Sequence, residues 1–359
     1  MVESFVYQAA PMRVVFGSGR LADLASELDR LGVKRALVLT TPQQKSHGEA
    51  VAAAIDGRAA GVYAGAVMHT PVDVTELAMQ QLKLLKADGL VAVGGGSTIG
   101  LGKALAFRTD LPQVVVPTSY AGSEMTPILG ETRDGLKTTQ SSPKILPETV
   151  IYDVDLTRTL PAAFAVTSGI NAIAHAVEAL YARDANPVVS LMAEDGIRLF
   201  AGALPKLAAG EDDANARDDA LRAAWLCGAC LGAVGMGLHH KLCHTLGGTF
   251  NLPHAETHTV ILPHAMAYNT PAVPAAAARV ARALGAEQAA QGLFALTRGL
   301  GARVALRDLG MPQDGIERAA DLAVSNAYWN PRPLERDAIR DLIARAWAGD
   351  PPAVTELAP

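Results

Sequence analysis

The sequence predicts an α/β N-terminal nucleotide-binding domain followed by an all-α C-terminal domain. In the N-terminal half, short runs of β-branched and other apolar residues alternate with segments of helical periodicity, a pattern typical of parallel strands joined by crossover helices. From residue 161 to residue 348, alanine and leucine dominate and apolar residues recur at helical spacing. We therefore expect two domains, at residues 1–158 and 159–359, with Pro161 marking the boundary.

Three short Val- and Leu-rich segments of the N-terminal half are predicted as buried strands, because each ends in turn-forming or polar residues. They are RALVLT (35–40), GLVAVGGG (89–96) and QVVVPTS (113–119). Helical periodicity between them indicates helices at 43–54 and 73–87. In the C-terminal half, we expect the helices to break where Pro, Gly, Asn or charged residues cluster, at ANPV (185–188), AGEDDANA (209–216), NTPAVP (269–274) and WNPRPLERD (329–337).

The composition excludes several classes of partner. The 359 residues carry 31 basic and 36 acidic side chains, and a formal charge of −5 provides no basic field for nucleic acid or an anionic membrane. The N-terminus lacks the pattern of a secretory signal, and no window reaches the roughly 18 apolar residues of a membrane span. We expect a cytoplasmic protein. Cys227 and Cys230 lie in a segment of small residues that is typical of a buried helix, so structural packing is the favoured interpretation.

A glycine-rich loop follows the second of the three predicted strands. The segment VAVGGGSTIGLGKALA places Gly94, Gly95, Gly96 and Ser97 at the end of a strand and the start of a helix. Glycines allow a phosphate to approach the backbone, and a helix N-terminus supplies free N–H groups, so a pyrophosphate is the expected ligand. The segment is not the G-x-G-x-x-G fingerprint of the Rossmann fold. The alternative is a tight turn between strand and helix without a ligand.

Two further segments contribute candidate cofactor-binding residues. Thr118, Ser119 and Tyr120 follow the next strand, at the carboxyl edge where open α/β sheets bind ligands. The strand that ends in LVLTTPQQK carries no acidic residue there, although a carboxylate at this point would hold a ribose 2′-hydroxyl and repel a 2′-phosphate. Thr41 imposes no such repulsion. The sequence therefore predicts that NADPH is accepted beside NADH.

The C-terminal half concentrates histidines in HHKLCHTLGGTFNLPH (239–254). His240 and His244 are four residues apart and share one face of a helix, and His175 shares a helical face with Asn171. With His254, they offer three imidazoles and an oxygen from two helices and a loop, a set that would suit a divalent metal. The alternative is that these histidines are hydrogen-bonded core residues.

Three other histidines and one lysine lie within or just after this segment. His239, His258 and His264 are individually ambiguous between the core and a site. Lys241 stands where the H-E-x-x-H motif of zinc proteases needs its glutamate base, which excludes that chemistry. An exposed salt-bridge lysine is the alternative to a functional role for Lys241.

Several ordered motifs together resemble the iron-containing alcohol dehydrogenase family. They are VGGGST, VPTSYAGSEMT, GINAIAHAVEALY, HHKLCHTLGGTFNLPH and a late NPRP, and they span nearly the whole chain. The resemblance implies a dehydroquinate synthase-like fold with the active site in the cleft between two domains. It places the metal ligands of the family on Asn171, His175, His240 and His254, with His244 beside the reacting centre. The family has an aspartate where this chain has Asn171, and the loss of the negative charge predicts that a metal is not required.

The departures from the family pattern resemble one branch of reductases that act in the degradation of aromatic compounds. Asn171, Lys241 and the segment PTSYAGSEMTPILGET carry this resemblance. It implies a homodimer that uses NADH or NADPH to reduce the C=C bond of a small unsaturated oxo-dicarboxylate. The catalytic residues would then be His244, His240, His175, Lys241 and Tyr120, with one histidine delivering a proton as imidazolium. The substrate-binding residues would be His254, Asn171, Arg332 and Asn330.

The same residues and motifs also allow other interpretations. Arg332 could clamp a carboxylate, but NPRP also suits a plain turn before a helix. The chain could be a metal-dependent alcohol or aldehyde dehydrogenase of the same family, in spite of Asn171. It could also be a phosphate-handling relative, such as a dehydroquinate synthase or a glycerol-1-phosphate dehydrogenase, or a noncatalytic nucleotide sensor in which the histidines only pack.

Overall fold

The computed structural model describes residues 4–133, 136–211, 213–325 and 327–354. The chain divides into two compact units. The sheet unit comprises Ala9–Leu160, and the helical unit begins at Pro161 and also includes residues 4–8. The sheet unit thus ends two residues after the predicted boundary at 158, and the sequence pattern gives no indication that residues 4–8 group with the helices.

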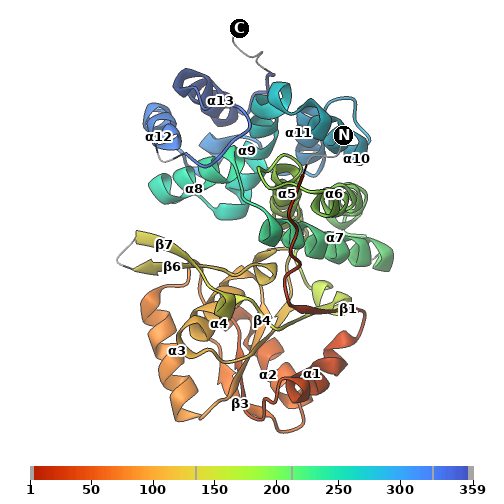
Figure 1. Ribbon diagram of the computed structural model, residues 1–359, viewed down its shortest axis with the longest axis vertical. Helices are drawn as coiled ribbons and strands as arrows, with labels where there is room; N and C mark the ends of the chain where they lie inside the picture. The colour runs from red at the N-terminus through yellow and green to blue at the C-terminus, as the bar shows by residue number, and fades with distance from the viewer. Residues whose placement is uncertain (1–3, 134–135, 212, 326, 355–359) are drawn as a thin grey trace. The chain divides into compact units, whose positions relative to one another are not determined.

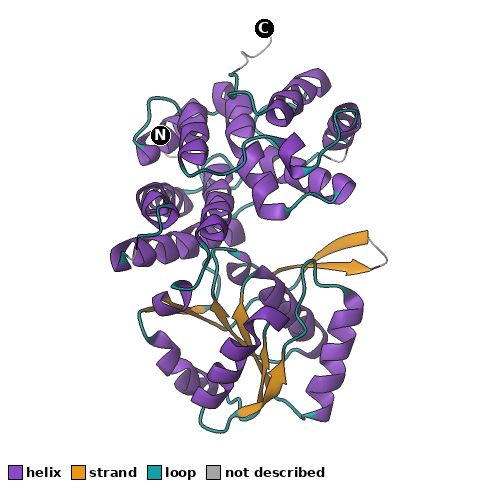
Figure 2. Ribbon diagram, turned by 180° about the vertical axis from the view of Figure 1, so that it is seen from behind, coloured by secondary structure: helices purple, strands orange, loops and turns teal. Residues whose placement is uncertain are grey.

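The sheet unit is built on six parallel strands in the order β1-β8-β5-β4-β2-β3. Figure 2 shows the strands of this unit in orange, with purple helices on both sides of them. The predicted strands are confirmed as β2 (Ala36–Leu39), β4 (Gly89–Gly94) and β5 (Gln113–Pro117). The other three are β1 (Arg13–Gly17), β3 (Ala59–Tyr63) and β8 (Thr149–Asp153). A two-stranded antiparallel sheet, β6 (Ile128–Arg133) with β7 (Leu136–Ser141), was not predicted. Because all six strands are parallel, their carboxyl ends meet at one edge of the sheet.

Helices cover both faces of this sheet. The side chains of each strand point alternately to the two faces, so the sheet unit has one hydrophobic core on each face. Leu37 and Leu39 pack with α3 (Val72–Leu84) and α4 (Gly96–Thr109), while Val38 packs with α1 (Leu24–Arg30) and α2 (Lys45–Ala54). Successive strand residues point to opposite faces, so a strand buried on both sides must be apolar throughout. This explains why β2, β4 and β5 are continuous apolar runs and could be recognised from the sequence.

The helical unit contains nine helices in its described part, labelled α5 to α13 in Figure 1. The four predicted breaks are confirmed: they fall after α5 (Ala162–Ala179), α6 (Pro187–Ala208), α9 (His254–Asn269) and α12 (Gly315–Val324). The remaining helices are α7 (Ala214–Ala233), α8 (Leu238–Phe250), α10 (Pro274–Leu284), α11 (Ala289–Gly299) and α13 (Arg336–Ala348). Asn186 caps α6 with its side chain, which accepts from the Val189 amide at 3.1 Å, and Pro187 follows at the first helical position.

Two expectations from the sequence concern the packing of the cysteines and the lack of a membrane-spanning segment. Cys227 and Cys230 are fully buried on α7 and form no disulfide, in agreement with structural packing. Burial raises the pKa of both thiols, which keeps them unreactive. Among the described residues, no single helix has the length and apolar character of a membrane span; α7 and α8 meet the test only as a pair bent by 94°.

Candidate active site

The glycine loop lies between β4 and α4, as predicted. Gly94 has φ +150°, and a Cβ there would come within 2.5 Å of the Thr98 hydroxyl; a Cβ at Gly95 would lie 2.9 Å from the Ser119 hydroxyl. Glycine at position 94 is therefore favoured by both its backbone conformation and its packing, and a side chain at position 95 would displace the Ser119 hydroxyl. A Cβ at Gly96 would meet only Ala121, at an ordinary 3.8 Å. Gly96 is exposed and opens α4, where N–H groups have no partner within the helix, so its lack of a side chain suits a ligand anion.

The ends of three neighbouring strands are tied together around this loop. The Thr118 amide donates to the Gly94 carbonyl at 3.1 Å, and the Gln44 side-chain amide donates to the Thr118 hydroxyl at 3.1 Å. The Thr41 hydroxyl accepts from the Gln44 amide at 3.3 Å, which caps a short 3-10 helix. We call residues 94–97, 118, 119 and 44 the cofactor corner. Gln44 was not predicted as a member; its place just after the second strand, at the ligand-binding edge, was the available signal.

The histidine cluster occupies the helical unit and draws on three helices. Asn171 and His175 lie on α5, and His240 lies on α8; all three are buried. The rings of His175 and His240 stack with their centroids 5.2 Å apart. His244 is exposed one turn further along α8. His254 is exposed as the first residue of α9, so the prediction that it lies in a loop is wrong.

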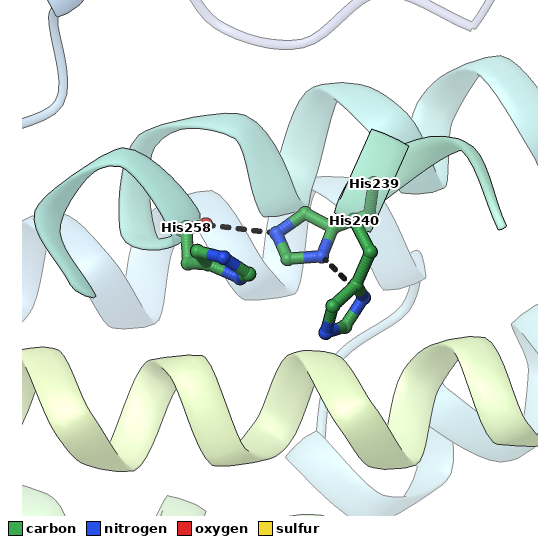
Figure 3. Close-up of side chains that lie close together, drawn as sticks. All are labelled: His239, His240 and His258. Carbon is green, nitrogen blue, oxygen red and sulfur yellow. Dashed lines mark hydrogen bonds between the residues drawn. The ribbon is translucent and has the colours of Figure 1, made fainter. Parts of the chain in front are cut away.

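Two of the ambiguous histidines join this cluster (Figure 3). His239 is fully buried, and its Nε2 lies 3.1 Å from the His258 carbonyl oxygen. The His258 ring is also fully buried, with its centroid 5.0 Å from that of His240 and 4.2 Å from that of His254. Neither ring nitrogen of His258 has a hydrogen-bond partner among the residues that the structure describes. His264 is buried elsewhere on α9, beside the ring of Phe294.

A buried carboxylate that the sequence analysis missed fixes the start of α8. Glu178 accepts from the Gly237 amide at 2.8 Å, the His239 amide at 2.7 Å and His240 Nδ1 at 2.7 Å. Because a carboxylate can only accept, His240 carries its proton on Nδ1 and has a lone pair on Nε2. Nε2 is buried and has no hydrogen-bond partner in the described part of the chain. The available signal was the spacing in HAVE, which puts Glu178 one helical turn after His175.

Burial controls the charge of the cluster. Desolvation lowers the pKa of His175, His240 and His258 well below 6.5, and that of His239 to about 3. Burial also raises the pKa of Glu178, against the hydrogen bonds that favour its charged form. The buried imidazoles are therefore neutral at pH 7. The hypothesis that a histidine delivers a proton as imidazolium is not supported for these four rings, and His244 is left as the exposed candidate.

His244 has a hydrogen-bond partner that the sequence analysis did not name. The Tyr328 hydroxyl lies 3.0 Å from His244 Nδ1, and Lys241 Nζ lies 5.8 Å from the centre of the Tyr328 ring. Burial raises the pKa of Tyr328, so its hydroxyl keeps its proton. Lys241 is half-buried and forms no ion pair with any described residue, which is not the salt-bridge lysine of the alternative interpretation. Tyr328 lies 84 residues beyond His244, so no spacing rule links the two.

Arg332 and Asn330 have structural partners. Arg332 is 2% exposed, stacks on the Tyr268 ring at 4.2 Å and donates to the Tyr268 carbonyl at 3.0 Å. The two amides of Asn330 and Asn269 exchange hydrogen bonds at 2.7 and 3.0 Å, and the Asn330 oxygen also accepts from the Leu238 amide at 3.4 Å. This arrangement argues against the predicted carboxylate clamp and favours the turn interpretation of NPRP. Tyr120 is fully buried, which offers a substrate no exposed hydroxyl.

The residues fit a tightly bound divalent metal poorly. His240 is oriented as a metal ligand would be, with Nδ1 held by a carboxylate and a lone pair on Nε2. However, Asn171 supplies a neutral oxygen, and Glu178 is occupied by three N–H donors. In the described part of the chain, the group of three ligand-type residues that converges within 4.8 Å is His239, His240 and His258, in which His239 Nε2 already bonds to a carbonyl. The set has no anionic ligand to favour iron or zinc.

Comparison with known proteins places the chain in a family. The family pattern described as iron-containing alcohol dehydrogenase matches residues 11–154, and the one described as the C-terminal part of that family matches residues 165–347. The chain belongs to the iron-containing alcohol dehydrogenase family. The resemblance seen in the motifs, and the fold that it implies, are therefore confirmed.

Within the iron-containing alcohol dehydrogenase family, the chain is most informatively compared with three relatives. It is 56% identical to maleylacetate reductase from Burkholderia cepacia, with 98% of this chain and 100% of the relative covered. The crystal structure of maleylacetate reductase from Agrobacterium tumefaciens has a TM-score of 0.95 at 55% identity, covering 98% and 100% of the two chains. A 1,3-propanediol oxidoreductase structure, at 27% identity, has a TM-score of 0.89 and covers 96% and 100%.

Because the buried histidines are neutral in the folded protein, we expect the protein to lose stability in acid. His264 allows this effect to be measured without changing the histidine cluster, since it lies elsewhere on α9. Burial, then the charge of Arg345, lowers the pKa of His264 from 6.5 to about 4. Between these values the unfolded chain binds more protons, so the stability is fully present above pH 6.5 and is lost as the pH falls towards 4. We expect the free energy of urea unfolding to fall less between pH 7 and 5 in His264→Gln than in the wild type, by about 2 kcal/mol. Equal falls in both proteins would contradict the assignment.

Proposed function

We propose that the chain is a maleylacetate reductase, which uses NADH or NADPH to reduce the C=C bond of maleylacetate to 3-oxoadipate in the degradation of aromatic compounds. The observation that carries the proposal is the neutral cluster of Asn171, His175 and His240 beside the His244–Tyr328 pair. It occurs in a chain whose 56% identity to a maleylacetate reductase extends over 98% of its length. The cofactor corner, with Gly96 open at the start of α4, supports a pyrophosphate ligand.

Reduction of maleylacetate requires groups that stabilise the negative charge developing on the ketone oxygen of the substrate. Maleylacetate is a dicarboxylate whose C2=C3 double bond is conjugated to a ketone at C4. Hydride adds to C2, negative charge develops on the ketone oxygen as an enolate, and a proton then reaches C3. Hydrogen-bond donors and cations placed where the charge develops lower the barrier of such a step. The protein must also bind the two carboxylates and provide the proton.

Polar groups of the helical unit can donate or accept hydrogen bonds to stabilise the enolate, bind the carboxylates and deliver the proton. With the Tyr328 hydroxyl donating to Nδ1, His244 carries its proton on Nε2, where it can donate to the substrate. The ammonium group of Lys241 can pair with a substrate carboxylate. Asn171 offers an amide, whereas the lone pair of His240 Nε2 can only accept. We therefore assign proton delivery to His244, carboxylate binding to Lys241, and orientation of the bound substrate to Asn171, His175, His240 and His254.

This assignment makes a metal unnecessary for turnover. The donors named above act without one, and the metal position that the resemblance implies holds Asn171 in place of an aspartate. A second candidate, a metal-dependent alcohol or aldehyde dehydrogenase, is favoured by one observation: the carboxylate-held lone pair of His240. The sequence has no dense run of Lys and Arg that would bind a substrate phosphate, which argues against the phosphate-handling relatives. A homodimer and a cytoplasmic location are carried over from the resemblance.

One assay distinguishes the metal-independent maleylacetate reductase from the metal-dependent dehydrogenase. Purified protein is treated with a chelator, its metal content is measured, and NADH oxidation is followed by absorbance after maleylacetate is added. We expect full NADH-oxidation activity with a metal content of about 0.1 equivalent per chain or less. No oxidation of NADH with maleylacetate, together with alcohol oxidation restored by iron, would instead establish the metal-dependent dehydrogenase. Tight NADH binding without any turnover would favour a nucleotide sensor.

The Tyr328 hydroxyl should matter for turnover more than for binding. Tyr328→Phe keeps the ring beside Lys241 and removes the hydrogen bond that orients His244. We expect kcat to fall about tenfold with little change in KM, since one hydrogen bond to a proton-transferring group is worth roughly 1.5 kcal/mol. Trp329→Phe is the matched control, because Trp329 is the adjacent exposed aromatic residue, 43% exposed. A normal kcat in Tyr328→Phe would remove this hydrogen bond from the mechanism.

A further inference from the structure

Lys103 on α4 is fully buried in the sheet unit, and its ammonium group binds the segment that follows strand β5. Nζ donates to the Thr126 hydroxyl at 2.9 Å, to the Ile128 carbonyl at 3.0 Å and to the Ser123 hydroxyl at 3.2 Å, and it also contacts the Ser123 carbonyl. An ammonium group has three protons, so these oxygens satisfy all of them. Burial lowers the pKa of Lys103 to about 7, against the opposing effect of Glu124.

The segment that Lys103 holds begins at the cofactor corner. The Thr118 amide bonds to the Gly94 carbonyl at 3.1 Å, and a Cβ at Gly95 would lie 2.9 Å from the Ser119 hydroxyl. Residues 118–121 therefore lie directly against the glycine loop. The same helix, α4, opens at Gly96 and carries Lys103 two turns later. The segment from Thr118 to Ile128 is thus bonded at one end to Gly94, the last residue of β4 before the glycine loop enters α4, and at its other end to Lys103 on α4.

A second buried contact fixes the middle of this segment. Glu124 is fully buried in the short 3-10 helix Ser123–Met125 and accepts from the hydroxyl of Tyr152, on strand β8, at 2.8 Å. Burying a lysine and a glutamate is unfavourable unless each is hydrogen-bonded, and apolar packing could have closed the segment at lower cost. In some proteins, buried hydrogen-bonded polar groups specify one conformation of the chain around them. Here the conformation specified is that of a segment contacting the glycine loop.

We propose that Lys103 is a positioning residue for the nicotinamide cofactor: by tying α4 to residues 123–128, it holds Thr118 and Ser119 against the glycine loop in the geometry that binds the pyrophosphate. The inference rests on the proposed function, because it takes the cofactor corner as the NADH site. Lys103 directs its N–H groups to protein oxygens and acts through the segment alone. Its loss should therefore weaken NADH binding and spare the groups that react with the substrate.

The experiment separates positioning from a merely structural role. In Lys103→Met, which removes the ammonium group and keeps an apolar stem, NADH binding is measured by fluorescence titration and turnover by absorbance with maleylacetate. We expect the Kd for NADH to rise about tenfold, while kcat at saturating NADH and the KM for maleylacetate stay within about threefold of the wild type. A structural role would lower the folded fraction and leave the Kd of the folded protein unchanged, and that result would overturn the proposal.

Two further variants keep the test decisive. Lys83→Met, an exposed lysine on α3 of the same unit, is the matched control and should leave the Kd for NADH unchanged. Thr126→Val removes one acceptor and keeps the ammonium group; we expect a rise of about two- to threefold in Kd. If Lys103→Met does not fold, an unchanged Kd in Thr126→Val would overturn the proposal. Failure of the wild type to bind NADH would instead overturn the proposed function.

Discussion

The hydrogen bonds of the buried Glu178 carboxylate determine where the histidine cluster lies. This side chain, in the last turn of α5, accepts from the first amides of α8 and from His240 Nδ1. An ionised carboxylate is stable in a protein interior only if its lone pairs are bonded, and the N-terminus of a helix is a favourable partner for negative charge. The same interaction therefore starts a helix, joins two helices and fixes one imidazole. Gly237 suits the junction, because a Cβ there would lie a tight 3.2 Å from the Glu178 side-chain oxygen.

The histidine cluster places one ligand-like imidazole among neutral groups. His240 is held with a lone pair on Nε2, and Asn171 on α5 carries no charge. Desolvation lowers the pKa of His175, His239, His240 and His258, so these buried rings stay neutral at pH 7, and a set without an anionic ligand binds a divalent cation weakly. Groups able to donate a proton or pair with a carboxylate then stand at the exposed side of α8, where His244 and Lys241 both approach Tyr328.

Sequence patterns predicted the elements whose burial is strong and uniform. Strands β2, β4 and β5 are apolar throughout because helices cover both of their faces. Strand β3, with the sequence AAGVY, is half-buried along its whole length and gives no comparable signal. The helix breaks were found because Pro and Asn impose local backbone preferences that do not depend on tertiary structure.

The candidate site was predictable where its residues share a helix and unpredictable where they meet through the fold. Asn171 with His175 and His240 with His244 follow from helical spacing. Tyr328 could not be found this way, since it reaches His244 from a distant segment, and the burial of Arg332 against Tyr268 is likewise a tertiary contact. The contacts of NPRP favour its interpretation as a turn, because the Asn330 side chain donates to the Arg332 carbonyl within the turn and Arg332 donates to the Tyr268 carbonyl.

The most direct test of the account is the protonation state of His240, read by NMR from its ring nitrogens in protein labelled with ¹⁵N-histidine at pH 7. The account requires a neutral ring with the proton on Nδ1, bonded to Glu178, and a bare Nε2. A proton on Nε2, or on both nitrogens, would contradict the claim that the carboxylate fixes this imidazole and that the cluster is uncharged.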